Sequence, residues 1–516
     1  MPLVVLLFAA ACFVVISTST KRSEVSRSAN GAWVQTPVKA HLVNGAVVTF
    51  RDGAWVWKDS VVGQGRHHDA LRELSRDARH VMMDSVIGLE AFQRETNPGR
   101  TLAYSAVTVA VTGALATIGT AVLLVVIFGS CPTIYADSAG VPSLQAEAFS
   151  YSIAPLLAKR DVDRLDVRAD AHGNVRLEIR NEALETHYID QLELLEARHD
   201  RDEFLLPAAR AGLVAVRNLN PVGSVHDARG RNVARQVARA DGVAFASDDR
   251  LLADAAEGRV AAEDYLDIVV PRAVGQDSLA LVLKMRSSLL STTIFYEHML
   301  ARSGARSLDW IGSDLSHITK VAQVAKWYTD NFGLRVLVRD GERWRPVVRL
   351  MDFGPVAWRN VAAIVANLPA GDSVRLRLAF APDEWRIDRI AVAWQSDVRR
   401  IEPRIVPLAR VTSSEGADRA DALDYLRKAD DRQLVTQPSN RFFAHFHVGP
   451  ETGQDRTFLI AADGYYVEWV RPSWIRSATD SLPFSPRTSK SEILRSWRAS
   501  KDSLESRFFR DRVPVL

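Results

Sequence analysis

The chain of 516 residues is too long for one ordinary domain, so roughly two to four folding units are expected. Hydrophobic residues at 47% and charged residues at 25% are typical of a folded protein, which excludes disorder as the default state. Two cysteines cannot form a disulfide framework, and a net charge of +3 without a long basic run excludes a typical nucleic-acid-binding protein.

An uncharged apolar run at residues 3–17 has about the length of a signal-peptide core. No Lys or Arg precedes it, which weakens the signal-peptide interpretation. Cys12 follows three alanines, and this resembles the lipobox in which a cysteine becomes the lipidated first residue of a bacterial lipoprotein. The first position of that pattern is Ala9 here instead of the usual Leu. Residues 1–18 are therefore predicted to be a signal peptide or short anchor, with Cys12 as a candidate lipidation site.

A second apolar run, at residues 103–128, is uncharged and longer than the roughly 20 residues that a helix needs to cross a bilayer. This pattern predicts a transmembrane helix. Arg79, Arg94 and Arg100 precede it, and no Lys or Arg follows until Lys159. Because positive flanking charge stays on the cytoplasmic side, the large C-terminal region is expected outside the cytoplasm of a bacterial cell, at its membrane or in its envelope.

The orientation depends on the fate of the first segment. If that segment is an uncleaved anchor with its N-terminus outside, Lys21 and Arg22 agree with the arginine bias. If it is cleaved, or if Cys12 is lipidated, residues 20–100 lie outside and the second segment would carry the large region inside. A second segment that lies in the membrane without crossing it would also resolve the conflict. These alternatives stay open.

Residues 33–98 are predicted to form a small β-barrel or meander. Strand patterns at 38–43 and 46–51 flank Asn44-Gly45, the pair that most readily forms a type I′ hairpin turn. Asp52-Gly53 repeats the turn signal before the next short strand. These closely spaced turns indicate a compact unit of short antiparallel strands.

Residues 131–516 contain several turn-bounded segments of alternating polarity, which predict a large β-rich region. Residues 131–199 are expected to form one β-rich domain. The stretches 131–150 and 176–199 resemble a block that recurs in uncharacterised bacterial envelope proteins, which implies location and class but no activity. Residues 200–262 are rich in Ala, Arg and Asp with weak periodicity, and are predicted to be an insertion or linker.

The clearest pattern spans residues 334–394, where a strand, an Asp340-Gly341 turn and further Trp-containing strands follow one another. This succession resembles the galactose-binding-like or MAM-like jelly roll. The resemblance implies a β-sandwich with inserted helices over residues 263–400. Arg389 stands where the last strand of the family carries a second Asp, so the resemblance does not extend to contacts made by that Asp.

Core residues of this sandwich follow from strand alternation. Ile387 and Ile390 are three residues apart, so strict alternation cannot turn both inward. One of them is expected beyond a bulge or at the strand end, and Ile387 is predicted to be buried together with Trp385. The predicted inward-facing residues are Val336, Val338, Val374, Leu376, Leu378, Ile387 and Ile390.

Two helices are expected beside the strands. Residues 313–332 predict a packing helix with Ser313 as its N-cap and with Leu315, Ile318, Val321, Ala325 and Tyr328 on one apolar face. Residues 401–516 are expected to hold a hairpin around Asp463-Gly464 and a docking helix that begins with the capping box Ser489 to Glu492.

No G-x-S-x-G, H-E-x-x-H, P-loop or dinucleotide motif occurs, so catalytic residues are unassigned and no cofactor is expected. His445 and His447 would share one face of a strand and form a candidate metal pair, which Asp463 or Glu468 could complete. An ordinary outward-facing pair is the simpler interpretation. Exposed aromatic rings can stack on sugars; the candidates are Trp344, Trp358, Trp385 and Tyr465, although core packing is the commoner role of such rings.

The expected fold is mainly β with a few packing helices: a small N-terminal β unit, one transmembrane helix and a large C-terminal region that contains a β-sandwich. We expect a membrane-anchored envelope protein, with a non-catalytic binding or structural module displayed outside the cytoplasm. Its partners would be the lipid bilayer and either carbohydrate or another envelope protein. The alternative is an envelope hydrolase acting on carbohydrate or peptide. A deep pocket with converging Asp, Glu or His would favour the hydrolase, and a shallow face rimmed by aromatic rings the binding module.

Overall fold

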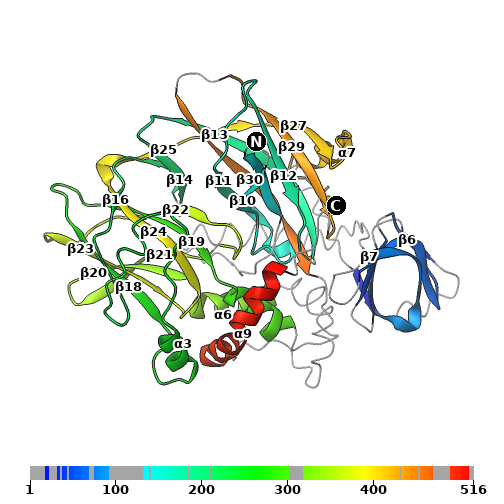
Figure 1. The fold of residues 1–516 in the computed structure, drawn as a ribbon, viewed down its shortest axis with the longest axis horizontal. Helices are drawn as coiled ribbons and strands as arrows, with labels where there is room; N and C mark the ends of the chain where they lie inside the picture. Colours follow the sequence, from blue (N-terminus) through cyan, green and yellow to red (C-terminus); the bar gives the residue numbers. More distant parts are fainter. Residues whose placement is uncertain are drawn as a thin grey trace, which may run out of the picture.

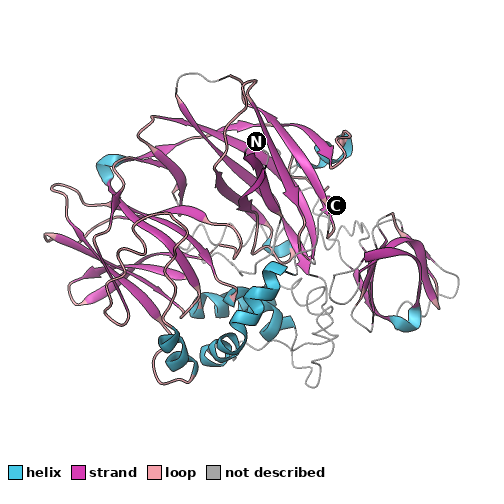
Figure 2. Cartoon of the chain, in the orientation of Figure 1, coloured by secondary structure: helices cyan, strands magenta, loops and turns pink. Residues whose placement is uncertain are grey.

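Among the residues that the computed structural model describes, strands dominate and form five sheets in three units (Figures 1 and 2). The structure describes residues 18–21, 32–34, 38–42, 46–50, 52–68, 75–91, 132–138, 141–183, 185–209, 211–300, 318–351, 353–430, 432–438, 440–450, 454–468 and 489–510. The chain is thus mainly β, and we describe the units as the barrel, the first sandwich and the second sandwich.

The predicted fold class is wrong in its transmembrane helix. No helix in the described ranges is long and apolar enough to cross a membrane. The longest of them, α9 (Lys490–Arg510), has nine charged residues in its sequence and buries Ile493, Leu494 and Trp497, which is the pattern of a helix docked on a protein surface. The segment 103–128 and Cys12 themselves lie outside the described residues.

The barrel is one curved antiparallel sheet of eight strands at the N-terminal end of the chain (Figure 1, blue). Inward-facing Val38, Ala40 and Phe50 belong to its core. Gly65 also faces inward, where a Cβ would come within 2.7 Å of a ring carbon of Phe50, so only glycine fits there. The strands are β1 (Thr18–Lys21), β2 (Ala32–Val34), β3 (Val38–Leu42), β4 (Val47–Phe50), β5 (Ala54–Val56), β6 (Ser60–His68), β7 (Ser75–Met82) and β8 (Val86–Ala91), with the short helix η1 (Met83–Ser85).

The first sandwich packs two five-stranded sheets around one apolar core. It is discontinuous in sequence, because strands from 133–199 pair with strands from 404–468. One sheet holds β9 (Thr133–Ser138), β10 (Val141–Glu147), β12 (Asn174–Arg180), β27 (Leu408–Ser413) and β29 (Arg441–His447). The other holds β11 (Lys159–Leu165), β13 (Glu185–His199), β26 (Arg404–Val406), β28 (Leu434–Thr436) and β30 (Asp455–Glu468).

The second sandwich is inserted between these two halves and is contiguous from 204 to 401. The predicted linker at 200–262 supplies its first four strands. One sheet holds β14 (Phe204–Ala208), β15 (Gly212–Val216), β16 (Asn220–Pro221), β19 (Leu279–Ser287), β22 (Arg359–Val365), β24 (Trp385–Trp394) and β25 (Val398–Ile401). The other holds β17 (Ser224–Asp227), β18 (Asp264–Pro271), β20 (Leu334–Asp340), β21 (Arg343–Leu350) and β23 (Ser373–Phe380).

The predicted core of the second sandwich lies in one buried cluster, with both Ile387 and Ile390 inside it. A bulge makes this possible: Met285 pairs with Ile387 while Lys284 pairs with Arg389, so Asp388 is the extra residue. At the first hairpin, Gly341 lies in a two-residue turn between β20 and β21. Its φ of 56° is in the left-handed region that such a turn requires.

The helices gather mainly along one side of the two sandwiches (Figure 2). α6 buries Val321, Ala325 and Tyr328, the face predicted from the sequence, whereas Ser313 lies outside the described residues. α9 is capped by the Ser489 hydroxyl, which accepts from the Glu492 backbone N–H at 3.2 Å. The remaining bounds are η2 (Pro155–Leu157), α3 (Asp249–Ala256), α4 (Leu290–Thr293), the π-helix η3 (Ile294–Leu300), α6 (Ile318–Asn331), η6 (Gln395–Asp397) and α7 (Ala420–Leu426).

The segment around Asp463-Gly464 is a continuous strand and not the predicted hairpin. β30 runs unbroken through both residues, and Gly464 lies opposite Lys159 on one side and Ile189 on the other. A Cβ at Gly464 would collide with the carbonyl oxygen of Tyr188. The glycine therefore serves a close approach of two strands and not a turn.

Candidate binding site on the N-terminal barrel

Three tryptophans lie side by side on the outer face of the barrel. Trp33 on β2 stands directly opposite Trp55 on β5, and Trp57 follows two residues later. The three residues are 46%, 44% and 38% exposed, respectively. The ring centroids of Trp33 and Trp55 are 5.6 Å apart, and those of Trp55 and Trp57 are 5.7 Å apart with ring planes inclined by 25°. We call these three residues the tryptophan platform.

The local sequence dictates this arrangement. In β5, Ala54 and Val56 face the barrel core, so strand alternation turns Trp55 and the following Trp57 outward. By contrast, Trp385 and Trp497 are fully buried in the sandwich region. Large apolar rings exposed together are uncommon on a folded surface and mark a contact site.

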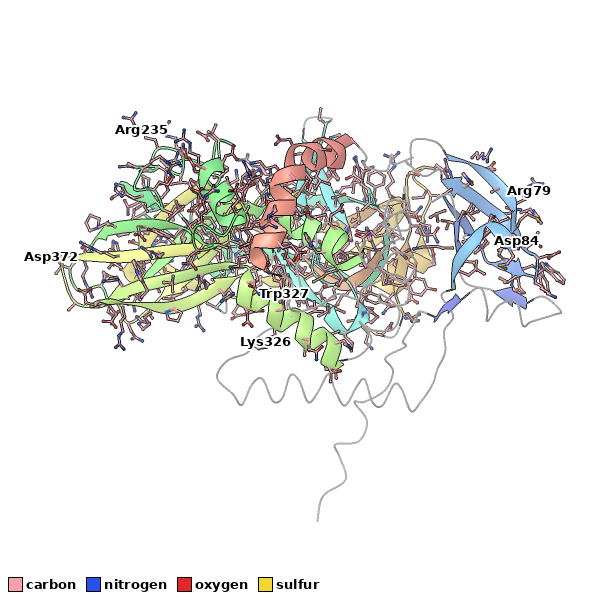
Figure 3. All side chains as sticks on the ribbon, turned by 90° about the horizontal axis from the view of Figure 1, so that it is seen from below. Arg79, Asp84, Arg235, Lys326, Trp327 and Asp372 are labelled. Atoms are coloured by element: carbon pink, nitrogen blue, oxygen red, sulfur yellow. The ribbon has the colours of Figure 1, made fainter. Side chains whose placement is uncertain are left out.

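A polar groove of about 320 Å³ opens on the same barrel. Most of its lining comes from β4, β6, β7 and the turn between β4 and β5. The first sandwich contributes two residues from the loop between β28 and β29. The lining residues are Thr49, Asp52, Gln64, Gly65, Arg66, Asp77, Ala78, Arg79, Gln437 and Pro438. Figure 3 shows Arg79 on the barrel, at the opposite end of the molecule from Asp372 in the second sandwich.

The groove mixes donors with acceptors. Arg66 and Asp77 are cross-strand neighbours on β6 and β7. Thr49 and Gln437 are only 3% and 4% exposed, yet the Thr49 hydroxyl and the Gln437 amide nitrogen have no hydrogen-bond partner among the described residues. Buried polar groups are normally paired, so these two atoms point to a ligand or water in the groove.

The barrel docks on the first sandwich beside this groove. Val38 and Ala40 face the barrel core, so Lys39 between them faces outward, and it is nevertheless fully buried. Burial lowers the pKa of His187 on β13 to about 3, with Glu468 raising it and the Lys39 ammonium lowering it further. The ammonium of the barrel and the imidazole of the sandwich therefore lie in one buried polar junction.

The four aromatic residues singled out in the sequence lie elsewhere. Trp385 and Tyr465 are buried, and Tyr465 stacks on Tyr188 with ring centroids 4.6 Å apart. Trp344 and Trp358 are half-buried. The Arg377 guanidinium lies 4.5 Å from the ring centroid of Trp344, and Lys284 and Arg286 lie 5.7 and 5.1 Å from that of Trp358. The structure does not bring these four rings together.

His445 and His447 lie on β29, and each contacts a polar side chain. The imidazole of His445 is 3.0 Å from the Thr412 hydroxyl, and that of His447 is 3.1 Å from the Asn174 amide oxygen. Asp463 belongs to β30 in the opposite sheet of the sandwich. In the part of the chain that the structure describes, no group of three or more His, Cys, Asp or Glu is placed to hold a metal ion.

Sequence reasoning missed the tryptophan platform, although a local signal for it exists. The stretch Ala54-Trp55-Val56-Trp57 alternates small or branched residues with tryptophan, and alternation in a short strand puts both rings on one face. The position of Trp33 opposite Trp55 depends on strand pairing, which the sequence alone does not reveal.

No protein-family model matches the chain, and no curated protein matches it significantly. Among solved structures, the chain is similar to the GH31 alpha-xylosidase from Xanthomonas citri, with 10% sequence identity and a TM-score of 0.17. The match covers 84% of this chain and 38% of that enzyme, so the chain spans less than half of the enzyme's length. A likeness of this size carries no argument about fold or activity. The part of the chain that the structure describes is β-rich, forms three units and carries the exposed tryptophan platform on its barrel.

Proposed function

We propose that this protein is a non-catalytic binding protein whose barrel binds carbohydrate on the tryptophan platform. The observation that carries the proposal is the side-by-side exposure of Trp33, Trp55 and Trp57 on one outer face. Pyranose rings present flat faces of C–H groups, which remove apolar surface from water when they lie on an indole ring. A row of three rings suits a ligand of several linked sugars.

The charge of the barrel supports a neutral partner. Residues 32–91 contain seven Lys or Arg and seven Asp or Glu, so their formal net charge is 7 − 7 = 0. Proteins that bind nucleic acids or other polyanions through stacked aromatic rings combine those rings with a positively charged groove. The balanced charge of this barrel favours an uncharged, hydroxyl-rich ligand.

The alternative of a hydrolase has less support from the described residues. Burial raises the pKa of Glu384 to about 7, and burial also raises the pKa of Asp163 well above its usual range. Shifts of this kind accompany acid–base catalysis where a substrate can reach the group. Glu384 lies between β23 and β24, Asp163 lies on β11 beside Arg359, and neither of them lines the groove.

Two predictions from the sequence are separate from this proposal. Localisation outside the cytoplasm of a bacterial cell, with a lipid bilayer as partner, is an expectation from the sequence alone. The galactose-binding-like resemblance of 334–394 concerns the second sandwich. Carbohydrate binding by the barrel depends on neither.

Isothermal titration calorimetry and tryptophan fluorescence with three hexasaccharides test the proposal: cellohexaose, N-acetylated chitohexaose and hexagalacturonate. We expect a neutral hexasaccharide to bind. Trp55→Ala should weaken binding about tenfold, because one ring face of roughly 60 Å² at about 25 cal/mol per Å² contributes about 1.5 kcal/mol. Trp344→Ala, which removes a half-buried ring elsewhere, is the control and should leave the affinity unchanged.

The proposal fails if none of the three hexasaccharides binds, or if Trp55→Ala binds as tightly as the unaltered protein. Because Trp55 is exposed, its replacement should leave the thermal melting temperature unchanged. That measurement separates a loss of binding from a loss of folding.

A further inference from the structure

The polar groove adjoins the tryptophan platform on the outer surface of the barrel. Asp52 occupies the turn that joins β4 to β5, three residues before Trp55. On β6, Val62 is the cross-strand partner of Trp55, and Gln64 of the groove lies two residues beyond it. A ligand longer than the platform therefore meets the groove next.

The chemistry of the groove selects groups that both donate and accept. Arg66 and Arg79 can only donate hydrogen bonds, whereas the carboxylates of Asp52 and Asp77 only accept. A ligand carboxylate would satisfy the arginines but would be repelled by the two aspartates. A hydroxyl group can serve both, because its oxygen accepts while its hydrogen is donated.

The first sandwich completes the groove through one fixed loop. The backbone N–H of Gln437 donates to the Asn440 side chain at 3.0 Å, and the Asn440 backbone N–H donates back to the Gln437 carbonyl at 2.9 Å. These bonds hold the loop and leave the Gln437 amide nitrogen without a partner at the groove. On the barrel side of the groove, the Thr49 hydroxyl likewise has no hydrogen-bond partner among the described residues.

We infer that this groove is the second half of the sugar site, and that it binds the hydroxyl groups of the sugar units beyond those stacked on the platform. The inference rests on the proposed function. It adds that the ligand is a neutral oligosaccharide and that the site is complete only with the barrel docked on the first sandwich. Ligand binding then stabilises this docking, because Gln437 and the barrel residues contact the same ligand.

Calorimetric titration of the full chain with cellohexaose, N-acetylated chitohexaose and hexagalacturonate tests this inference. Arg79→Ala and Gln437→Ala should each weaken the binding of the neutral hexasaccharide about threefold to tenfold, as expected for the loss of one hydrogen bond. Arg76→Ala is the matched control, since Arg76 is an exposed arginine three residues earlier on β7 that does not line the groove. Its affinity should equal that of the unaltered protein.

Three outcomes would overturn the inference. If Trp55→Ala weakens binding while Arg79→Ala and Gln437→Ala leave it unchanged, the platform binds sugar and the groove holds only water. If hexagalacturonate binds more tightly than both neutral hexasaccharides, the arginines select a carboxylate, and the inference that the groove binds hydroxyl groups is wrong. If no hexasaccharide binds at all, the proposed function fails together with the inference.

Discussion

At the scale of single residues, Asp388 determines which side chains of β24 reach the core. Its buried carboxylate accepts from the Gly242 backbone N–H at 2.9 Å and pairs with the Lys284 ammonium at 2.8 Å. These contacts hold the extra residue of the bulge in place. Both Ile387 and Ile390 consequently face the core, and Trp385 joins them there.

Replacing Trp385 by Ala should lower the free energy of unfolding by about 3–5 kcal/mol, the cost of removing a large ring from a packed core. The Trp385 ring packs edge-on against Phe353 with centroids 5.5 Å apart, and it is fully buried. Urea denaturation measures the change. Trp344→Ala, which removes a half-buried ring, should cost much less, and equal losses in the two variants would contradict the assignment of Trp385 to the core.

At the scale of elements, α9 fastens the C-terminal segment to the body of the protein. The Lys490 ammonium donates to the Ala262 carbonyl at 3.1 Å, and Arg495 donates to the Ala256 carbonyl at 3.3 Å. In the interior, the indole N–H of Trp497 donates to the Asp383 carboxylate at 2.8 Å. Backbone acceptors near α3 and one buried carboxylate thus fix the N-terminal part of the helix.

Trp497→Phe keeps the apolar ring of α9 but removes its N–H, so the buried Asp383 carboxylate loses one partner. We expect the free energy of unfolding to fall by about 1.5–3 kcal/mol, the usual range for a hydrogen bond to a charged group. Combining it with Asp383→Asn gives a double-mutant cycle measured by urea denaturation. Asn is the suitable replacement because residue 383 has a φ of 63°, which Asn tolerates. A coupling energy near zero would refute the role of this contact.

At the scale of the whole molecule, a buried ionic cluster joins the two sandwiches. Arg359 on β22 of the second sandwich contacts Asp161 and Asp163 on β11 of the first, at 2.5 and 2.6 Å. Burial raises the pKa of Asp163. Burial also acts to raise the pKa of Asp161, but the Arg359 guanidinium outweighs it, so that pKa ends below its usual value. Glu147 adds a second link by accepting from two backbone N–H groups of the second sandwich.

Arg359→Met should lower the free energy of unfolding by about 3–5 kcal/mol at pH 8, because two carboxylates are left buried without their cation. Without Arg359 the folded-state pKa values of these carboxylates rise above their unfolded values. The stability that these two carboxyl groups contribute is then present at low pH and is lost as the pH rises through their folded-state pKa values. The loss of unfolding free energy in the variant should therefore be smaller at pH 5 than at pH 8.

Urea denaturation at both pH values measures this dependence. Arg410→Met, which removes an exposed partner of Asp418, is the matched control and should cost at most about 1 kcal/mol at either pH. If Arg359→Met loses the same free energy of unfolding at pH 5 and at pH 8, the buried carboxylates are not the cause of the loss.

Local patterns were sufficient to predict many of the strands and both packing helices. Alternation identified the inward residues of β20, β23 and β24, and the apolar face of α6 followed from helical spacing. Local patterns could not predict that β29 pairs with β12, because no short-range signal records a partner more than 250 residues away. The two-residue strand β16 is likewise too short to show any period.

Glycine and tryptophan each serve two purposes, which limits what residue type alone can predict. Asp463-Gly464 has the composition of a hairpin turn, but here glycine is required by the close approach of the Tyr188 carbonyl. Tryptophan is found both in cores and at binding faces, so Trp385 and Trp55 cannot be told apart by residue type. Only the neighbours in space separate them: Trp385 lies inside a closed sandwich, and Trp55 lies on the outer face of a barrel.

The discontinuity of the first sandwich sets an order of events on the ribosome. The 204 residues from 200 to 403 separate β13 from β26, so at about 5–20 residues per second roughly 10–40 s pass before the second half of this sandwich emerges. The contiguous second sandwich can fold during that interval. Until then, β12 and β13 have unpaired edges, because their partners β29 and β30 have not yet been synthesised. These two strands are therefore the part of the nascent chain most open to aggregation or to binding by a chaperone.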